Sequence, residues 1–125
     1  MIVEIRTVEK NGAKIAVVTA DEKLLYDVQS ALDLMATVQY EADSSRIAVY
    51  KEAVAEEFFI LSTRLAGEIL QKFTNYHCKL AIIGDYSKYT SKPLRDFIYE
   101  SNHGRDIFFV ATETEAVERL GGSVI

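Results

Sequence analysis

The stretch KLAIIGDYSKYTSKPLRDFIYESNHG, residues 79–104, decides the fold expected for this chain. Its apolar run stops at Gly84 and Asp85, a polar loop of hydroxyls and lysines follows, and an amphipathic segment comes next. This pattern predicts a strand, a loop and a helix over residues 92–102. In an open α/β sheet such a loop lies at the carboxyl end of a strand, where ligands and partners bind. The stretch therefore predicts both a fold class and the place of a site.

Helix-boundary signals extend from this stretch toward the end of the chain. Residues 107–111, IFFVA, have the composition of a further buried strand. Serine and threonine favour the N-cap, and glycine often follows the last turn of a helix. The boundary residues expected on this basis are Ser91 before and Gly104 after the helix over residues 92–102, Thr112 and Glu115 as a capping box for a last helix, and Gly121-Gly122 at its end.

The beginning of the chain predicts a β-hairpin and then a helix. Residues 2–8 alternate apolar and polar, and residues 14–19 are richer in β-branched side chains. Asn11-Gly12 lies between them and tolerates the positive φ angles of a tight hairpin turn. Apolar residues at spacings of three and four then predict a helix that covers at least residues 27–37.

The middle of the chain supplies another strand and helix. Residues 46–50, RIAVY, suit a strand that is covered on both faces. Apolar positions from Leu61 onward repeat at helical spacing and predict a second helix that ends near Asn75-Tyr76. Gly67 lies inside this helix, where glycine costs about 1 kcal/mol relative to alanine. We therefore expect Gly67 to mark close packing against the sheet.

The order of these elements predicts an α/β fold. An N-terminal β-hairpin is followed by βα units, which gives a mostly parallel or mixed five-stranded sheet with about four helices. Right-handed crossovers should connect the parallel strands. The sequence contains no repeat, linker or low-complexity segment, so a single domain over residues 1–125 is expected.

Composition excludes several classes of function. The net charge of −5 argues against binding of nucleic acid or of anionic membranes, because phosphate groups would be repelled. The single cysteine, Cys78, and two histidines give no zinc spacing and no internal disulfide, and Cys78 is interpreted as a small buried residue. No basic leader or membrane-length apolar run is present. We expect a cytoplasmic protein with no metal or other cofactor.

The loop after residue 84 is the main candidate site. Asp85 either anchors a ligand or acts as a base, or it closes a turn by accepting backbone N–H groups. The cations of the loop could hold an anion at the helix N-terminus, although the spacing of a phosphate-binding loop is missing. The candidate residues for a ligand or partner are Asp85, Tyr86, Ser87, Lys88, Tyr89, Ser91, Lys92 and Arg95.

Aromatic residues accompany this loop and the start of the second helix. Tyr86 and Tyr89 suit a protein contact, since tyrosine combines apolar area with a polar tip, or they fold back over the edge of the sheet. Phe58 and Phe59 are expected in the core. Because adjacent aromatic side chains are not expected to point the same way, one of these two should line the cleft or an interface.

Several segments of the sequence resemble one small bacterial family. They are AGEILQKF with the following NY, then KLAIIGD, SKY, SK and LRDFIYESN, and they cover most of residues 66–102. This wording resembles the domain-of-unknown-function family numbered 4180. The resemblance implies a compact domain and supplies no reaction.

The order of elements also resembles that of STAS domains, the fold of anti-sigma-factor antagonists. In those domains a serine at the start of the second helix is a phosphorylation switch on the partner-binding face. The residues in register here are Ser62 and Thr63, followed by Arg64, which could pair with a phosphate. Leu61 stands where the motif has an aspartate, and the alternative is that Ser62 or Thr63 caps the helix.

Two functions follow from these features. The first is a non-catalytic regulatory or interaction domain that binds a protein partner, or a second copy of itself, through the strand-to-helix loops. The second is a domain, or an enzyme, that holds a small anionic ligand with Lys88, Lys92 and Arg95 while Asp85 serves as base or anchor. The absence of a recognisable catalytic set in the sequence favours the first function.

Overall fold

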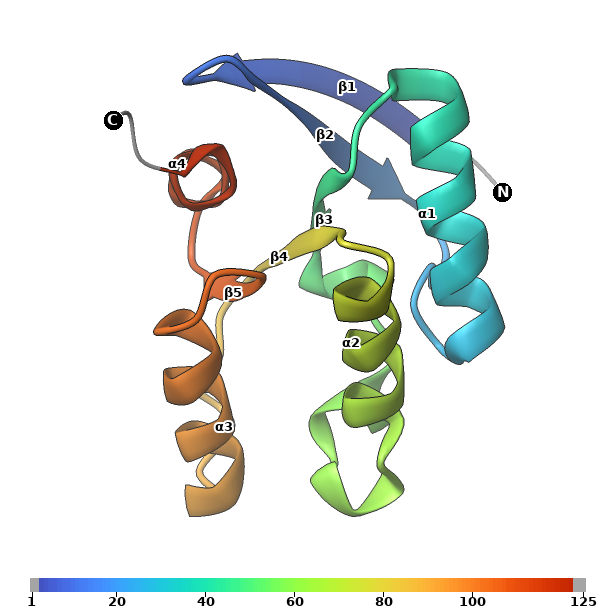
Figure 1. Ribbon diagram of the computed structural model, residues 1–125. Coiled ribbons are helices and arrows are strands. Elements are labelled where there is room, and N and C mark those ends of the chain that lie inside the picture. The colour runs from blue at the N-terminus through green and yellow to red at the C-terminus, as the bar shows by residue number, and fades with distance from the viewer. Residues whose placement is uncertain (1–2, 123–125) are drawn as a thin grey trace.

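The computed structural model describes residues 3–122 and is built on one mixed sheet with the strand order β1-β2-β3-β4-β5 (Figure 1). β1 is antiparallel to β2, and the remaining neighbours are parallel. The five strands are β1 (Val3–Lys10), β2 (Ala13–Ala20), β3 (Arg46–Tyr50), β4 (Lys79–Ile83) and β5 (Ile107–Val110). The sheet is the predicted five-stranded, mostly parallel one that begins with a hairpin.

Helices cover the two faces of this sheet unequally. Three helices lie on one face and the last lies on the other (Figure 1). Right-handed crossovers that always step in the same direction along a sheet place their helices on one side, which explains the first three. The helices are α1 (Val28–Ala42), α2 (Leu65–Asn75), α3 (Lys92–Asn102) and α4 (Glu113–Gly121). The predicted α/β fold class is confirmed.

The hairpin turn has the conformation that its sequence predicts. Asn11 has φ 54° and Gly12 has φ 81°, and Lys10 pairs directly with Ala13 across them. Two positive φ angles in a two-residue loop match the right-handed twist of the flanking strands. The side-chain amide of Asn11 also donates to the carbonyl oxygen of Gly122, 2.8 Å away, which ties the turn to the end of α4.

The core consists of two clusters separated by the sheet. Alternation along a strand explains the division, as in β4, where Leu80 and Ile82 belong to the large cluster and Ala81 and Ile83 to the small one. The large cluster lies under α1, α2 and α3 and includes Phe58. Among the helices of residues 3–122, α4 is the one that covers the small cluster.

The predicted N-caps Ser91 and Thr112 are confirmed, but of the capping box expected for Thr112 and Glu115 only the bond to the Thr112 hydroxyl is formed. The Ser91 hydroxyl accepts from the N–H of Leu94, and the Thr112 hydroxyl accepts from the N–H of Glu115. Gly122, with φ 68°, terminates α4. The first helix has a capping box that was not predicted, in which Asp27 and Ser30 each accept from the other's backbone N–H.

Three expectations for the segment before and within α2 were wrong. The helix begins at Leu65 and not at Leu61, because residues 56–59 and 61–63 form short 3-10 helices and Arg64 adopts a left-handed conformation with φ 66°. Gly67 is exposed, and an added Cβ would meet no atom within 4 Å, so it marks no close packing. Phe58 and Phe59 are both buried in the large cluster, which confirms the expected core placement, and the expectation that one of them lines the cleft or an interface was wrong. Their 3-10 backbone, unlike an extended one, lets adjacent side chains enter the same core.

Candidate functional site

The carboxyl ends of β3 and β4 come into close contact at the edge of the sheet. A Cβ added to Gly84, which follows β4, would lie 2.6 Å from the Cβ of Lys51, which follows β3. No real side chain tolerates such a distance, so glycine allows the two loops to approach. This contact brings the loop after β4 onto the segment of 3-10 helices between β3 and α2.

Asp85 closes a turn in this loop. Its Oδ1 accepts from the backbone N–H of Ser87 at 2.9 Å, and its side chain is exposed. The backbone and side-chain hydrogen bonds from Ser87 lower the pKa of Asp85. The geometry matches the turn interpretation of this aspartate.

The two loop tyrosines fold back over the sheet. The Tyr86 hydroxyl donates to the carbonyl oxygen of Ile82 at 2.5 Å, and the ring of Tyr89 stacks on that of Phe59 with centroids 4.9 Å apart. Burial raises the pKa of Tyr86, and burial together with the hydrogen bond to Glu56 raises the pKa of Tyr89 to about 12. Both phenols are therefore neutral anchors of the loop at physiological pH.

The cations of the loop are engaged with separate partners. Lys88 pairs with Glu56 at 3.2 Å, and Lys92 pairs with Asp96 at 2.7 Å within α3. Ser91 caps the same helix. The structure thus keeps the two lysines apart and does not assemble them with Asp85 into one anion site.

A shallow cavity of about 450 Å³ lies at the carboxyl edge of the sheet. Its charged lining groups are two carboxylates, Glu52 and Asp85. The rest of the lining is formed by Tyr50, Ile83, Gly84, Tyr86 and Ala111. Since like charges repel, this cavity is unsuited to the small anion considered from the sequence.

Arg95 lines a different groove, between the loop and α3. This groove has a volume of about 490 Å³, and neither acidic residues nor lysines line it. Hydroxyl groups of Ser87 and Thr90 lie along it, with the rings of the loop tyrosines and Tyr99. Among the loop candidates Lys88, Lys92 and Arg95, it is Arg95 that lines this groove together with hydroxyl groups.

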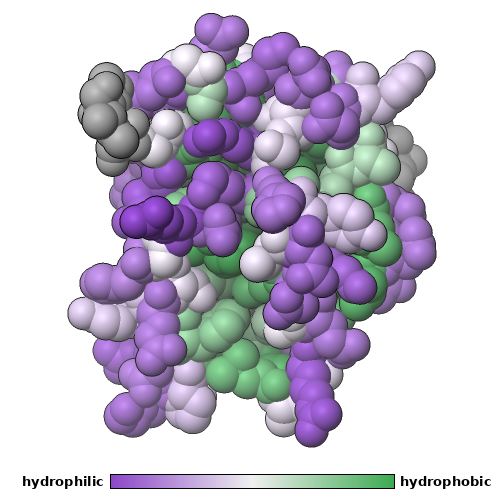
Figure 2. Space-filling view, in the orientation of Figure 1, coloured by the Kyte–Doolittle hydropathy of each residue, from purple (hydrophilic) through white to green (hydrophobic). Residues whose placement is uncertain are grey.

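The segment before α2 meets a cavity with a volume of about 660 Å³. It extends from Val28, at the start of α1, across the exposed side of α2 to Phe97 of α3. Figure 2 shows hydrophobic surface between α2 and α3 with hydrophilic side chains on both sides. The complete lining is Val28, Leu61, Arg64, Gly67, Glu68, Gln71, Lys72 and Phe97. We call this feature the α2 groove.

The proposed switch residues differ in their surroundings. The Thr63 hydroxyl lies 2.8 Å from the carbonyl oxygens of both Glu57 and Ile60 and accepts from the N–H of Leu65 at 3.2 Å. Thr63 therefore stabilises the start of α2 from just outside it. Ser62 is exposed, and Arg64 occupies the N-cap position without a side-chain cap bond.

Two groups of residues near the carboxyl edge were not singled out from the sequence. Lys51 lies over the rings of Tyr89 and Phe59, at 4.9 and 5.4 Å from their centroids. Its place directly after a buried strand, like that of Gly84 before Asp85, was the available signal. The second group is an ion pair of Arg6 with Glu113 at 2.5 Å, which Tyr50 joins through its hydroxyl at 3.0 Å. Because these residues are far apart in sequence, nothing local indicated the contact.

The described residues contain neither a metal-binding cluster nor a membrane-spanning helix. Among residues 3–122 there is no group of three or more His, Cys, Asp or Glu side chains placed to hold a metal ion. Within the same range, every helix is too short or too polar to cross a membrane.

Comparison with known proteins assigns the chain to a family. No curated protein and no solved structure shows significant similarity to it. One family model, described as a domain of unknown function, DUF4180, matches residues 10–120, which span every element from the hairpin turn to α4. A match over this much of the chain shows membership and agrees with the resemblance found in residues 66–102. The chain belongs to the DUF4180 family.

Proposed function

We propose that this domain is a non-catalytic interaction module that binds an acidic, amphipathic segment of a protein partner in the α2 groove. The observation that carries the proposal is the pairing of two conformationally costly residues in that groove. Gly67 weakens an exposed helix by about 1 kcal/mol relative to alanine. Arg64 holds a left-handed backbone that non-glycine residues seldom adopt. Costs of this kind concentrate at functional sites.

The space around Gly67 supports binding from outside. A side chain at this position would meet nothing within 4 Å, so packing inside the domain does not require a glycine. A glycine does let another backbone approach the helix closely. Apolar anchors would contact Leu61 and Phe97, since central apolar contacts supply most of the binding energy of protein interfaces.

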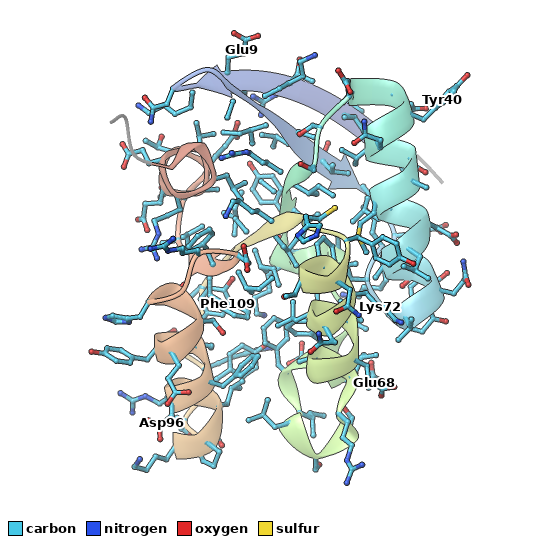
Figure 3. The ribbon with its side chains drawn as sticks, viewed as in Figure 1. Glu9, Tyr40, Glu68, Lys72, Asp96 and Phe109 are labelled. Atoms are coloured by element: carbon cyan, nitrogen blue, oxygen red, sulfur yellow. The ribbon has the colours of Figure 1, made fainter. Side chains whose placement is uncertain are left out.

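The rim of the groove supports an acidic partner. Arg64 and Lys72 outnumber Glu68 among its charged residues, whereas the chain as a whole is acidic. Figure 3 shows Glu68 and Lys72 projecting from the same side of α2. Carboxylates of a partner would be attracted to this rim more than to the remaining surface. The resemblance to STAS domains, whose partners bind near the start of the second helix, is in accord with this placement. The proposal also locates the protein in the cytoplasm.

Selection of peptides by display, followed by affinity measurements on variants of the domain, tests the proposal. Peptides selected on the wild-type domain should carry apolar residues beside aspartate or glutamate, and fluorescence anisotropy should show about tenfold or greater loss of affinity for Gly67→Gln and Leu61→Glu. The matched control is Glu41→Gln, an exposed helical position in α1 outside the α2 groove. The proposal is overturned if no such peptides are selected, or if neither Gly67→Gln nor Leu61→Glu changes their affinity.

Phosphorylation of Ser62 would regulate this binding. Ser62 is exposed two residues before Arg64, so a phosphate there would pair with the guanidinium and compete with acidic side chains of the partner. Ser62→Asp should weaken binding of a selected peptide, whereas Ser62→Ala should leave it unchanged. Equal affinity of Ser62→Asp and the wild type would exclude the switch.

A second function is supported by the groove that contains Arg95. A guanidinium with nearby hydroxyl groups and aromatic rings suits a small anionic ligand with a planar part. A thermal-shift screen against phosphorylated metabolites and nucleotides tests it, because a ligand at 100 times its dissociation constant adds about 2.7 kcal/mol of stability. A stabilising ligand should lose its effect in Arg95→Gln, and a screen without any shift would count against this function.

A further inference from the structure

β1 presents a long, unpaired edge to solvent. It pairs with β2 through eight residues in continuous register, without proline, glycine or a bulge. In residues 3–122 no other strand lies on its outer side, and Figure 1 shows that edge along the top of the molecule. An exposed edge of this length offers a template for another strand, which proteins usually prevent by shortening, bending or covering it.

The hairpin turn determines which backbone groups of β1 face outward. In an antiparallel pair closed by a two-residue turn, the pair next to the turn is hydrogen-bonded, and every second pair follows it. Lys10 and Ala13 are that first pair, so the even-numbered residues of β1 bond to β2. The N–H and C=O groups of Ile5, Thr7 and Glu9 therefore point away from the sheet.

Two copies of β1 can pair antiparallel about a two-fold axis, and the residue at which the axis lies faces its own copy. The charges along β1 favour one of these registers. An axis at Arg6 would place two arginines opposite each other, and an axis at Val8 would place Arg6 opposite Lys10, both destabilising. An axis at Thr7 places Glu4 opposite Lys10 twice and Ile5 opposite Glu9. An axis at Ile5 would oppose Glu4 to Arg6, but Arg6 is already paired with Glu113 and the overlap is shorter.

The charged residues that would pair across the axis at Thr7 have no ion-pair partner in the part of the chain that the structure describes. Glu4 and Lys10 are exposed, and within residues 3–122 neither forms an ion pair. We infer that two copies of this chain associate through β1 in antiparallel register centred on Thr7, so that their sheets become continuous. This surface lies apart from the α2 groove, and the inference does not depend on the proposed function.

Charge exchange tests the register. Sedimentation velocity of the full chain should show a dimer, and Glu4→Lys and Lys10→Glu should each weaken dimerisation about tenfold or more by opposing like charges twice. The double variant with both exchanges should recover the dimer, because the pairs are restored with reversed sign. Glutamate at residue 10 keeps the Cβ and Cγ that pack against Gly121.

Further variants separate the edge from other surfaces. Thr7→Pro removes an outward N–H and should give monomers, since proline is tolerated on edge strands. Glu100→Lys, exposed on α3 and away from β1, is the matched charge control and should not affect the dimer. Circular dichroism verifies that each variant is folded. A monomeric wild type, a dimer insensitive to both single exchanges, or one sensitive to Glu4→Lys alone would overturn the inference.

Discussion

At the residue scale, two glycines have opposite relations to their surroundings. Gly84 permits the contact between the loops after β3 and β4, whereas a Cβ added to Gly67 would meet no atom within 4 Å. The sequence suggested packing for Gly67 because a glycine inside a helix usually has a packing reason. Nothing in the sequence showed that Lys51 would lie against Gly84, since the two residues meet only through the pairing of β3 with β4.

Gly84→Ala should destabilise the protein by about 1–3 kcal/mol, because the new Cβ overlaps the Cβ of Lys51 and one of the two loops must move. Urea denaturation followed by circular dichroism measures the free energy of unfolding. An unchanged midpoint would show that the loops relax freely.

Gly67→Ala is the matched comparison and should stabilise the protein by up to about 1 kcal/mol, because alanine favours the helix and finds open space. The same denaturation experiment measures it. Destabilisation would mean that the surface at Gly67 is covered in solution, as self-association at the α2 groove would cause.

At the scale of elements, regular structure was predicted better than the segment before α2. The bounds of β3 and α3 agree with those expected, because apolar runs and caps act locally. The start of α2 was placed four residues too early, since the apolar spacing continues through Leu61 while the backbone does not. Likewise, the sequence identified Asp85 and the loop tyrosines but not Lys51, which completes their packing.

The 3-10 segment stabilises the fold through its aromatic residues. Phe58 is almost completely buried and contacts the rings of Phe59 and Phe109. Phe58→Ala should therefore cost about 3–5 kcal/mol of stability, which is typical of an emptied core position. Tyr40→Ala, at a side chain that is 90% exposed, should stay within about 0.5 kcal/mol of the wild type. Similar losses for both, measured by chemical denaturation, would contradict the described burial.

At the scale of the whole molecule, an ion pair links the first strand to the last helix. The hydrogen bond from Arg6 lowers the pKa of Glu113, and Tyr50 adds a second hydrogen bond to the same carboxylate. At pH values between the lowered pKa of Glu113 and its ordinary value, the unfolded chain therefore binds more protons than the folded one. The stability from this site is complete above the unfolded pKa of about 4.3 and is lost as pH falls through the folded pKa.

Glu113→Gln should flatten this acid dependence. Between pH 7 and pH 3 the melting temperature of the wild type should fall further than that of the variant, as measured by circular dichroism at constant ionic strength. Equal decreases in the two proteins would show that the pair of Arg6 and Glu113 does not contribute.

The sequential strand order has a consequence for synthesis. Each strand pairs with the strand that precedes it in the chain, so no strand has to wait for a later one. As the chain leaves the ribosome, the sheet can grow one strand at a time from the hairpin, and each crossover helix can pack as its unit is completed. The small apolar face waits longest, because α4 follows all the other elements of residues 3–122 in the chain. Docking of α4 is thus the step that removes this apolar surface from solvent and ends its exposure to non-specific association.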